Sequence, residues 1–298
     1  PPNTTGPDGI RLPPRKFFGN IDTRGSIRDD FASMWDQFTP ENAGKWALVQ
    51  TAPDTWKWTT LDTMYKHCRE NGILFKGHTF CWGSAVPSWV NNDNAESAVK
   101  TWMSGFCERY PDVSTINVVN EALHVSPSYK DALGGAGTSG YDWIVNAFKW
   151  ARESCPNAIL IYNDYNTIEW TSDNNAVISL VKAVRAAGGP IDGVGCEAHE
   201  VSRANLTVDM IKAYTEKIIA ETGVPVYITE MDVATADDER QLEVIKGVVE
   251  ALWPNEMVKG WTYWGYLQGA TWRTNSHLML TDATRRPALS WLMTLVGR

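Results

Sequence analysis

Two glutamates stand where two separate apolar runs end, and this position gives them possible chemistry. Glu121 closes the run that begins at Val118, and Glu230 closes the run that begins at Val226. A buried carboxylate is costly unless another group pairs with it. Two carboxyl groups that flank one sugar linkage perform glycoside hydrolysis, in which one donates a proton and the other attacks or activates water. The alternative is that both glutamates form structural ion pairs, and composition alone does not separate these hypotheses.

The elements that must position these residues follow a regular pattern. Short runs rich in β-branched and aromatic residues predict eight strands, at 16–22, 37–46, 74–82, 116–122, 158–165, 193–198, 225–233 and 258–266. Amphipathic stretches between them predict helices at 60–70, 95–109, 141–153, 176–187, 208–221 and 239–252. This alternation predicts the α/β class, with a single (β/α)8 TIM barrel over residues 1–298 that includes an extended N-terminal segment at 1–15.

A doubly wound sheet is the alternative fold, but no GxGxxG turn follows the first predicted strand. In a (β/α)8 barrel the active site lies at the carboxyl ends of the strands. Polar residues that end the predicted strands are therefore the candidate site residues.

Composition excludes several classes of function. The chain has 298 residues, 43% of them hydrophobic, and a formal net charge of −8. This charge argues against binding to nucleic acid or to an anionic membrane, and no apolar stretch is long enough for a membrane span. Fifteen tryptophans are many for this length, and indole rings stack on the apolar faces of sugars. We expect a carbohydrate substrate, no cofactor and a monomer.

The five cysteines, at 68, 81, 107, 155 and 196, lack metal-ligand spacing, so we expect no metal site. We predict a disulfide between Cys107 and either Cys68 or Cys155, with Cys81 and Cys196 free near the cleft. Asn3 and Asn205 begin N-glycosylation patterns. Together with a start that lacks Met, these patterns weakly favour a secreted, extracellular protein.

The sequence resembles glycoside hydrolase family 10, whose typical members are endo-β-1,4-xylanases with a (β/α)8 barrel. The resemblance covers nearly the whole chain and rests on motifs in strand order. They are Thr39-Pro40-Glu41-Asn42 with Lys45-Trp46, Gly77-His78-Thr79 with Trp82, Val118-Val119-Asn120-Glu121, Asn163-Asp164-Tyr165-Asn166, His199, Ile228-Thr229-Glu230-Met231-Asp232, Trp264-Gly265 and Trp272-Arg273.

This resemblance implies a retaining mechanism in which Glu121 is the acid/base and Glu230 the nucleophile. It implies support from Asn120, which would contact the sugar 2-hydroxyl, and from His199 and Asp232 beside Glu230. It also implies substrate-binding roles for Glu41, Asn42, Lys45, His78, Trp82, Asn163, Tyr165, Trp264 and Trp272.

Three positions depart from the family pattern near the subsite for the cleaved sugar. Gly83 and Ala85 stand where the family has His and Gln, and Glu197 stands where it has Gln. The two small residues predict a subsite widened for a hexose, and Glu197 adds a possible ligand for a sugar hydroxyl. We therefore expect an enzyme like the family's fungal tomatinases, which remove the oligosaccharide from the steroidal glycoside α-tomatine. The alternatives are an endo-1,4-β-xylanase and, more remotely, a catalytically silent carbohydrate-binding protein or inhibitor.

Overall fold

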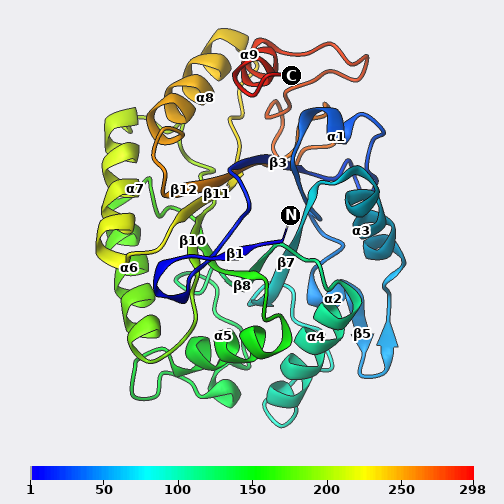
Figure 1. The fold of residues 1–298 in the computed structure, drawn as a ribbon, viewed down its shortest axis with the longest axis vertical. Helices are drawn as coiled ribbons and strands as arrows, with labels where there is room; N and C mark the ends of the chain where they lie inside the picture. The colour runs from blue at the N-terminus through cyan, green and yellow to red at the C-terminus, as the bar shows by residue number, and fades with distance from the viewer. Residues whose placement is uncertain (1) are drawn as a thin grey trace.

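The fold is a closed barrel of eight parallel strands surrounded by helices, seen in a computed structural model that describes residues 2–298 (Figure 1). In sequence order the strands are β3 (Phe17–Ile21), β4 (Gln37–Thr39), β7 (Leu74–Trp82), β8 (Thr115–Asn120), β9 (Ile159–Asp164), β10 (Gly193–Cys196), β11 (Val226–Met231) and β12 (Val258–Tyr263). Each strand pairs with the next, and β12 pairs with β3 to close the barrel. The predicted (β/α)8 barrel is confirmed.

A helix follows each barrel strand, and α2 is an additional short turn. The helices are α1 (Phe31–Met34), α2 (Trp46–Val49), α3 (Thr59–Asn71), α4 (Ala95–Arg109), α5 (Asp142–Ser154), α6 (Thr171–Ala186), α7 (Val208–Thr222), α8 (Asp238–Leu252) and α9 (Pro287–Leu295), with 3-10 turns at η1 (Pro7–Gly9) and η2 (Lys130–Leu133). Across residues 2–298, none of the helices is long and apolar enough to cross a membrane.

The long helices bury one apolar stripe against the barrel. In α4 the buried positions include Ala95, Val99, Trp102 and Phe106, which recur at the spacing of one helical face. Local signals set helix ends, as in α7, where the Thr207 hydroxyl accepts a hydrogen bond from the Met210 N–H. The predicted bounds of α4 agree with the structure, whereas α6 begins five residues earlier than expected.

The second predicted strand, 37–46, is too long. In the structure β4 ends at Thr39, and a turn leads from Pro40 to α2. Pro40 has no N–H to donate to a sheet. A Cβ atom on Gly44 would lie 2.6 Å from the carbonyl oxygen of His78, so this turn packs directly against β7. The turn carries Glu41, Asn42 and Lys45 to the mouth of the barrel.

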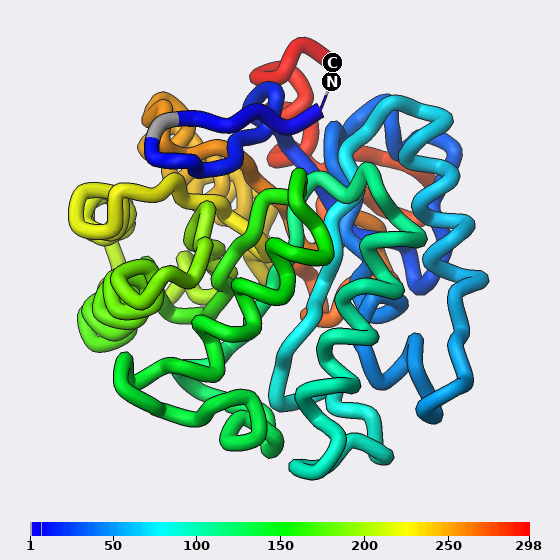
Figure 2. Tube along the Cα trace, turned by 60° about the horizontal axis from the view of Figure 1, so that its bottom comes forward, coloured from blue at the N-terminus to red at the C-terminus, as the bar shows by residue number. Residues whose placement is uncertain are grey.

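The N-terminal segment forms a small hairpin rather than a simple extended chain. Strands β1 (Thr4–Thr5) and β2 (Arg11–Leu12) pair antiparallel across the end of the barrel where its strands begin (Figure 2). The Asn3 amide donates hydrogen bonds to the carbonyls of Ser114 and Asn157, at 2.7 and 3.1 Å. Because this amide is engaged, the glycosylation pattern at Asn3 gives little support for secretion. A second hairpin, β5 (Gln50–Ala52) with β6 (Thr55–Trp56), precedes α3.

A disulfide joins Cys107 at the end of α4 to Cys155 just after α5, with 5.5 Å between the Cα atoms. The prediction for Cys107 is confirmed, with Cys155 as the partner. Cys68, Cys81 and Cys196 are free and buried, and burial raises the pKa of the Cys81 and Cys196 thiols to about 12. These thiols are therefore protonated at neutral pH.

Candidate active site

A cleft of about 670 Å³ opens at the carboxyl ends of the barrel strands. Most of the predicted site residues line it, namely Glu41, Asn42, Lys45, His78, Trp82, Asn120, Glu121, Tyr165, Glu197, His199, Glu230, Trp264 and Trp272. The structure therefore brings together residues from all eight of the predicted motifs, spread from position 41 to position 272. This cleft is the candidate active site.

Backbone geometry aims Glu121 into the cleft. Glu121 is the first residue after β8 and adopts a left-handed backbone conformation, with φ of 56°. Its N–H donates to the Asn163 carbonyl at 2.8 Å, which continues the pairing with β9, and its own carbonyl accepts from the Val125 N–H at 2.7 Å. The Oε2 atom of Glu121 accepts a hydrogen bond from the Trp82 indole at 2.9 Å.

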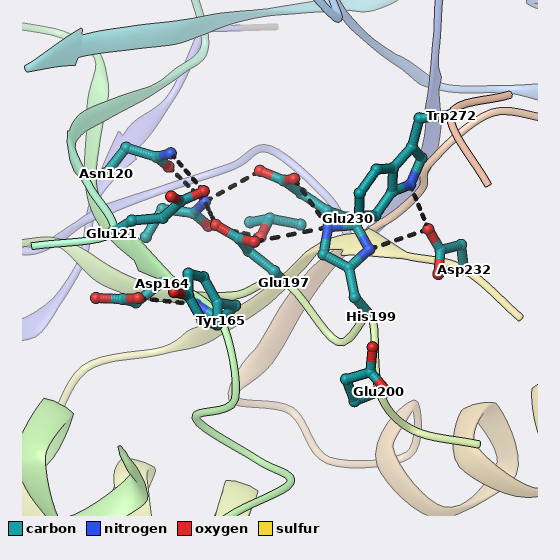
Figure 3. A network of polar contacts seen from close by, with 12 residues as sticks. Asn120, Glu121, Asp164, Tyr165, Glu197, His199, Glu200, Glu230, Asp232 and Trp272 are labelled. Atoms are coloured by element: carbon teal, nitrogen blue, oxygen red, sulfur yellow. Dashed lines mark hydrogen bonds and ion pairs between the residues drawn. The ribbon is translucent and has the colours of Figure 1, made fainter. Parts of the chain in front are cut away.

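Glu230 lies inside β11 and is 6% exposed. Its Oε2 atom lies 3.2 Å from His199 Nε2, and its Oε1 atom accepts from Asn163 Nδ2 at 3.1 Å. His199 Nδ1 in turn lies 3.0 Å from Oδ2 of Asp232, which also accepts a hydrogen bond from the Trp272 indole at 2.6 Å (Figure 3). The imidazole is thus held between two carboxyl groups.

These surroundings move the two glutamate pKa values in opposite directions. Burial, together with the charge of Glu230, raises the pKa of Glu121 to about 6. Burial also penalises the charge on Glu230, but the hydrogen bond and charge of His199, with the charge of Lys76, outweigh it and lower the pKa of Glu230 to about 2. Near pH 4, therefore, Glu121 is protonated while Glu230 is ionised.

His199 is the main cation that keeps Glu230 ionised. Burial lowers the pKa of His199, but hydrogen bonds to Asp232 and Glu230 raise the pKa to about 9. Glu197, His199 and Glu230 each have one nitrogen or oxygen atom within 4.8 Å of the corresponding atoms of the other two, a grouping that metal sites also show. Because the protonated imidazole offers no lone pair, the His199 contacts favour an ion-pair network over a metal site.

Asn163, which is expected to bind substrate, is not among the residues that line the cleft. The side chain is fully buried in β9, beneath the cleft rather than lining it. Its Nδ2 atom donates to Asn120 Oδ1, Glu197 Oε1 and Glu230 Oε1, while its Oδ1 atom accepts from the Thr229 hydroxyl at 2.6 Å. Asn163 therefore holds the site residues in register.

Sugar-binding candidates occupy the turn after β4 and the ends of β7 and β12. The N–H of Glu41 donates to Asp22 Oδ1 at 2.7 Å, and Lys45 Nζ donates to Asn42 Oδ1 at 2.7 Å while lying over the Trp82 ring. Burial lowers the pKa of His78 to about 3, so the ring is neutral. Its Nδ1 atom accepts from Asn117, which leaves Nε2–H as a donor.

Two tryptophans enclose the cleft in different ways. Trp264 is 5% exposed and meets the His78 ring edge-on, with ring centroids 5.4 Å apart. Trp272 is 53% exposed and presents its ring to solvent at the rim.

The two small residues, Gly83 and Ala85, are not among the described residues that line the cleft. A Cβ atom on Gly83 would lie 2.5 Å from the carbonyl oxygen of Val125, so the loop after β8 fills the space of a side chain. The Ala85 carbonyl accepts from the Ala47 N–H at 3.2 Å. The surroundings of Gly83 therefore give no support for a hexose-sized enlargement there.

Sequence reasoning missed His124, Trp170 and Glu200. His124 lies between Asp164 and Asp173, with 2.7 Å from each ring nitrogen to a carboxylate oxygen, and stacks on Tyr165 at a centroid distance of 3.8 Å. Its hydrogen bond to Asp164 raises the pKa of His124. Trp170 and Glu200 line the cleft, and a side-chain hydrogen bond joins Glu200 to Arg273. All three lie in loops, where the strand pattern gives no signal.

A barrel with two carboxyl groups of separated pKa at its strand ends is the arrangement of a glycosidase. Comparison with known proteins specifies the family. The family model described as "Glycosyl hydrolase family 10" matches residues 14–294. The chain belongs to glycosyl hydrolase family 10.

Two bacterial relatives illustrate this membership. Endo-1,4-beta-xylanase B of Cellvibrio japonicus (strain Ueda107) is 40% identical over 282 residues, which cover 94% of this chain and 45% of that protein. Endo-1,4-beta-xylanase B of Thermotoga neapolitana is 30% identical over 250 residues, which cover 78% of this chain and 70% of that protein. The chain thus spans less than half the length of the first relative.

Solved structures agree on the fold. The structure of GH10 from Paenibacillus barcinonensis superposes with a TM-score of 0.84 at 21% identity, covering 95% of each chain. That of xylanase 10B from Thermotoga petrophila RKU-1 in complex with xylobiose gives a TM-score of 0.80 at 25% identity, covering 95% of this chain and 94% of that one.

Proposed function

We propose that this chain is the catalytic part of a retaining endo-1,4-β-xylanase. The observation that carries the proposal is the pair Glu121 and Glu230, which face one cleft with their pKa values driven apart, to about 6 and about 2. One group is therefore an acid while the other is a nucleophile.

In the first step the Glu230 carboxylate attacks the anomeric carbon as Glu121 gives its proton to the departing oxygen. This forms a glycosyl ester on Glu230 and leaves Glu121 ionised. In the second step Glu121 takes a proton from water, the hydroxide attacks the anomeric carbon, and Glu230 departs as a carboxylate. Asn120, whose Nδ2 atom lies 3.3 Å from Glu121 Oε1, would contact the sugar 2-hydroxyl.

The shape of the site supports a polymeric substrate. A second hollow of about 550 Å³ adjoins the cleft and shares Glu41, Asn42 and Trp272 with it. A single sugar does not need both hollows, whereas a chain of sugars would occupy them in succession. The exposed Trp272 ring, at 53%, offers an apolar face between them.

The relatives support the substrate assignment. The two relatives described above are named xylanases, and the loop after β8 fills the space beside Gly83. The sequence-based preference for a fungal tomatinase-like enzyme acting on a steroidal glycoside is therefore not supported. The alternative kept beside it, an endo-1,4-β-xylanase, is the better assignment.

We further propose that the protein is secreted and acts as a monomer. A disulfide between Cys107 and Cys155 supports secretion, because such bonds persist in oxidising compartments. Intact-mass labelling of the secreted protein that finds three free thiols rather than five would agree with this proposal.

The activity is tested by hydrolysis of xylan, mixed-linkage β-glucan and an aryl β-hexoside side by side. We expect short xylo-oligosaccharides from xylan, initially in the β-anomeric form by NMR. Rapid cleavage of the hexoside or glucan with no attack on xylan would contradict the substrate, and an initial α-anomer would contradict retention.

A further inference from the structure

Glu197 is a third carboxyl group in the cleft, and the mechanism above gives it no role. It lies directly after β10, is 2% exposed, and its N–H donates to the Asp164 carbonyl at 3.1 Å. Its Oε1 atom accepts from Asn163 Nδ2 at 3.1 Å, the same nitrogen that reaches Glu230. Its Oε2 atom lies 3.6 Å from His199 Nε2.

Glu197 and Glu121 line the same cleft. Asn163 Nδ2 donates to Glu197 and also to Asn120, whose own Nδ2 atom lies 3.3 Å from Glu121 Oε1. A hydrogen bond between the two carboxyl groups would lower the pKa of Glu121. Two carboxyl groups can share a hydrogen bond only when one of them carries the proton. Burial raises the pKa of Glu197 well above its usual range, and the charges of Glu230 and Glu121 raise it further. The proton of this pair therefore belongs to Glu197.

The charged groups around Glu197 agree with a proton on Glu197. Four acidic side chains act on it from four different segments, namely Glu121 after β8, Asp164 in β9, Glu169 in the loop that follows β9, and Glu230 in β11. The cations facing it are His199, which Glu230 and Asp232 already share, and Lys76 in β7. If Glu197 were ionised, its charge would lie mainly beside other negative charges.

We propose that Glu197 is a positioning residue that stays a neutral acid and donates a hydrogen bond to the Glu121 carboxylate. This inference rests on the proposed function. When Glu121 gives its proton to the departing oxygen, the Glu197 hydroxyl stabilises the charge that Glu121 acquires. When Glu121 takes a proton from water, the same hydrogen bond weakens. Glu197 begins and ends both steps protonated, so the proton balance of the reaction is unchanged.

The variant Glu197→Gln separates this role from a structural one. Gln has the same shape, can accept from Asn163 and donate to Glu121, and cannot ionise. A carboxylic O–H is a stronger donor to a carboxylate than an amide N–H, so its loss should raise the pKa of Glu121. We expect the alkaline limb of kcat/KM on xylan to move upward by roughly half a pH unit.

Other outcomes overturn the proposal. A downward shift would mean that Glu197 is ionised and repels a charge on Glu121, and an unmoved limb would mean that Glu197 is only structural. Glu250→Gln is the matched control, because Glu250 lies on α8 with a 56% exposed side chain. It removes one carboxylate from the surface and should leave the limb in place.

An infrared measurement on the unaltered protein detects the proton on Glu197 without an activity assay. At about pH 8, above the values of about 6 for Glu121 and about 7 for Glu169, Glu197 should keep a carboxylic-acid C=O band. In the difference spectrum against Glu197→Gln this band should disappear. Loss of a carboxylate band instead would overturn the proposal. If the protein cleaves no glycoside, the proposed function fails while the band still reports on Glu197.

Discussion

Glu121 and Glu230 are the same residue type at the same end of the same barrel, with β9 and β10 between their strands, yet their partners differ in charge. Glu121 follows β8 in a left-handed turn and receives a hydrogen bond from the neutral Trp82 indole. Glu230 lies within β11 and receives one from His199, whose pKa of about 9, raised by Asp232 and Glu230 against the effect of burial, keeps the ring charged.

The comparison shows which kind of donor decides the protonation state of a buried acid. Burial raises the pKa of both glutamates. A neutral donor offsets only part of this effect, whereas an imidazolium held by Asp232 reverses it. The difference between about 6 and about 2 follows from the partners, and each partner can be removed separately.

The largest effect is expected for Glu230→Ala, because no covalent intermediate can form without the nucleophile. We expect kcat on xylan to fall by at least roughly 10⁴-fold, measured by release of reducing ends. Addition of azide should restore turnover of an aryl xyloside and give the α-glycosyl azide. Near-normal xylan hydrolysis by this variant would remove Glu230 from the mechanism.

Glu121→Ala should have the next largest effect, and the effect should depend on the leaving group. On xylan, whose departing oxygen needs a proton, we expect a loss of about 10²–10⁴-fold. On an aryl xyloside with a strongly acidic phenol, formation of the glycosyl-enzyme should be nearly unaffected, seen as a rapid burst of phenol. An equal loss on both substrates would argue that Glu121 is not the acid.

His199→Gln tests the cation beside Glu230. Without the imidazolium, the pKa of Glu230 should rise from about 2 toward its usual value of about 4.3. Because Glu230 must be ionised to attack, the acid limb of kcat/KM should move upward, so activity is lost at a higher pH as the solution is acidified. His67→Gln, on α3, is the control and should leave this limb unchanged.

Trp82→Phe should give the smallest effect. This effect should fall on the alkaline limb of kcat/KM, whereas His199→Gln acts on the acid limb. Trp82→Phe removes the neutral donor to the Glu121 carboxylate, so the pKa of Glu121 should rise above about 6. The alkaline limb of kcat/KM should then move upward by about half a pH unit while the acid limb stays in place. A shift of the acid limb would show that the two glutamates do not have separate surroundings.

Features that leave a local pattern in the sequence could be predicted from it. Apolar runs with a polar residue at the end predicted the barrel strands and placed Glu121 and Glu230 at the same end of the barrel. The strand at 37–46 was too long because apolar residues such as Trp46 continue past Pro40 into a packed turn and then into α2. Cys107 had two possible partners, since α3 and α5 both flank α4 in sequence, and packing of α4 on α5 selects Cys155.

Features that depend on contacts between distant segments could not be predicted in this way. Gly83 looked like an opening because nothing in the sequence shows that the Val125 carbonyl occupies the space beside it. Asn163 looked like a sugar ligand because a strand-end motif does not distinguish a side chain in the cleft from one beneath it. His124 is held by the carboxylates of Asp164 and Asp173, which lie 40 and 49 residues further along the chain.

The measurement that tests the central claim most directly is a carbon-13 NMR titration of the glutamate side-chain carboxyls, with Glu121→Gln and Glu230→Gln to assign the two signals. We predict that Glu230 titrates at about 2 and Glu121 at about 6 in the free protein. Two signals that titrate together near the usual value of about 4.3, or in the reverse order, would contradict the claim that different partners separate these two carboxyl groups.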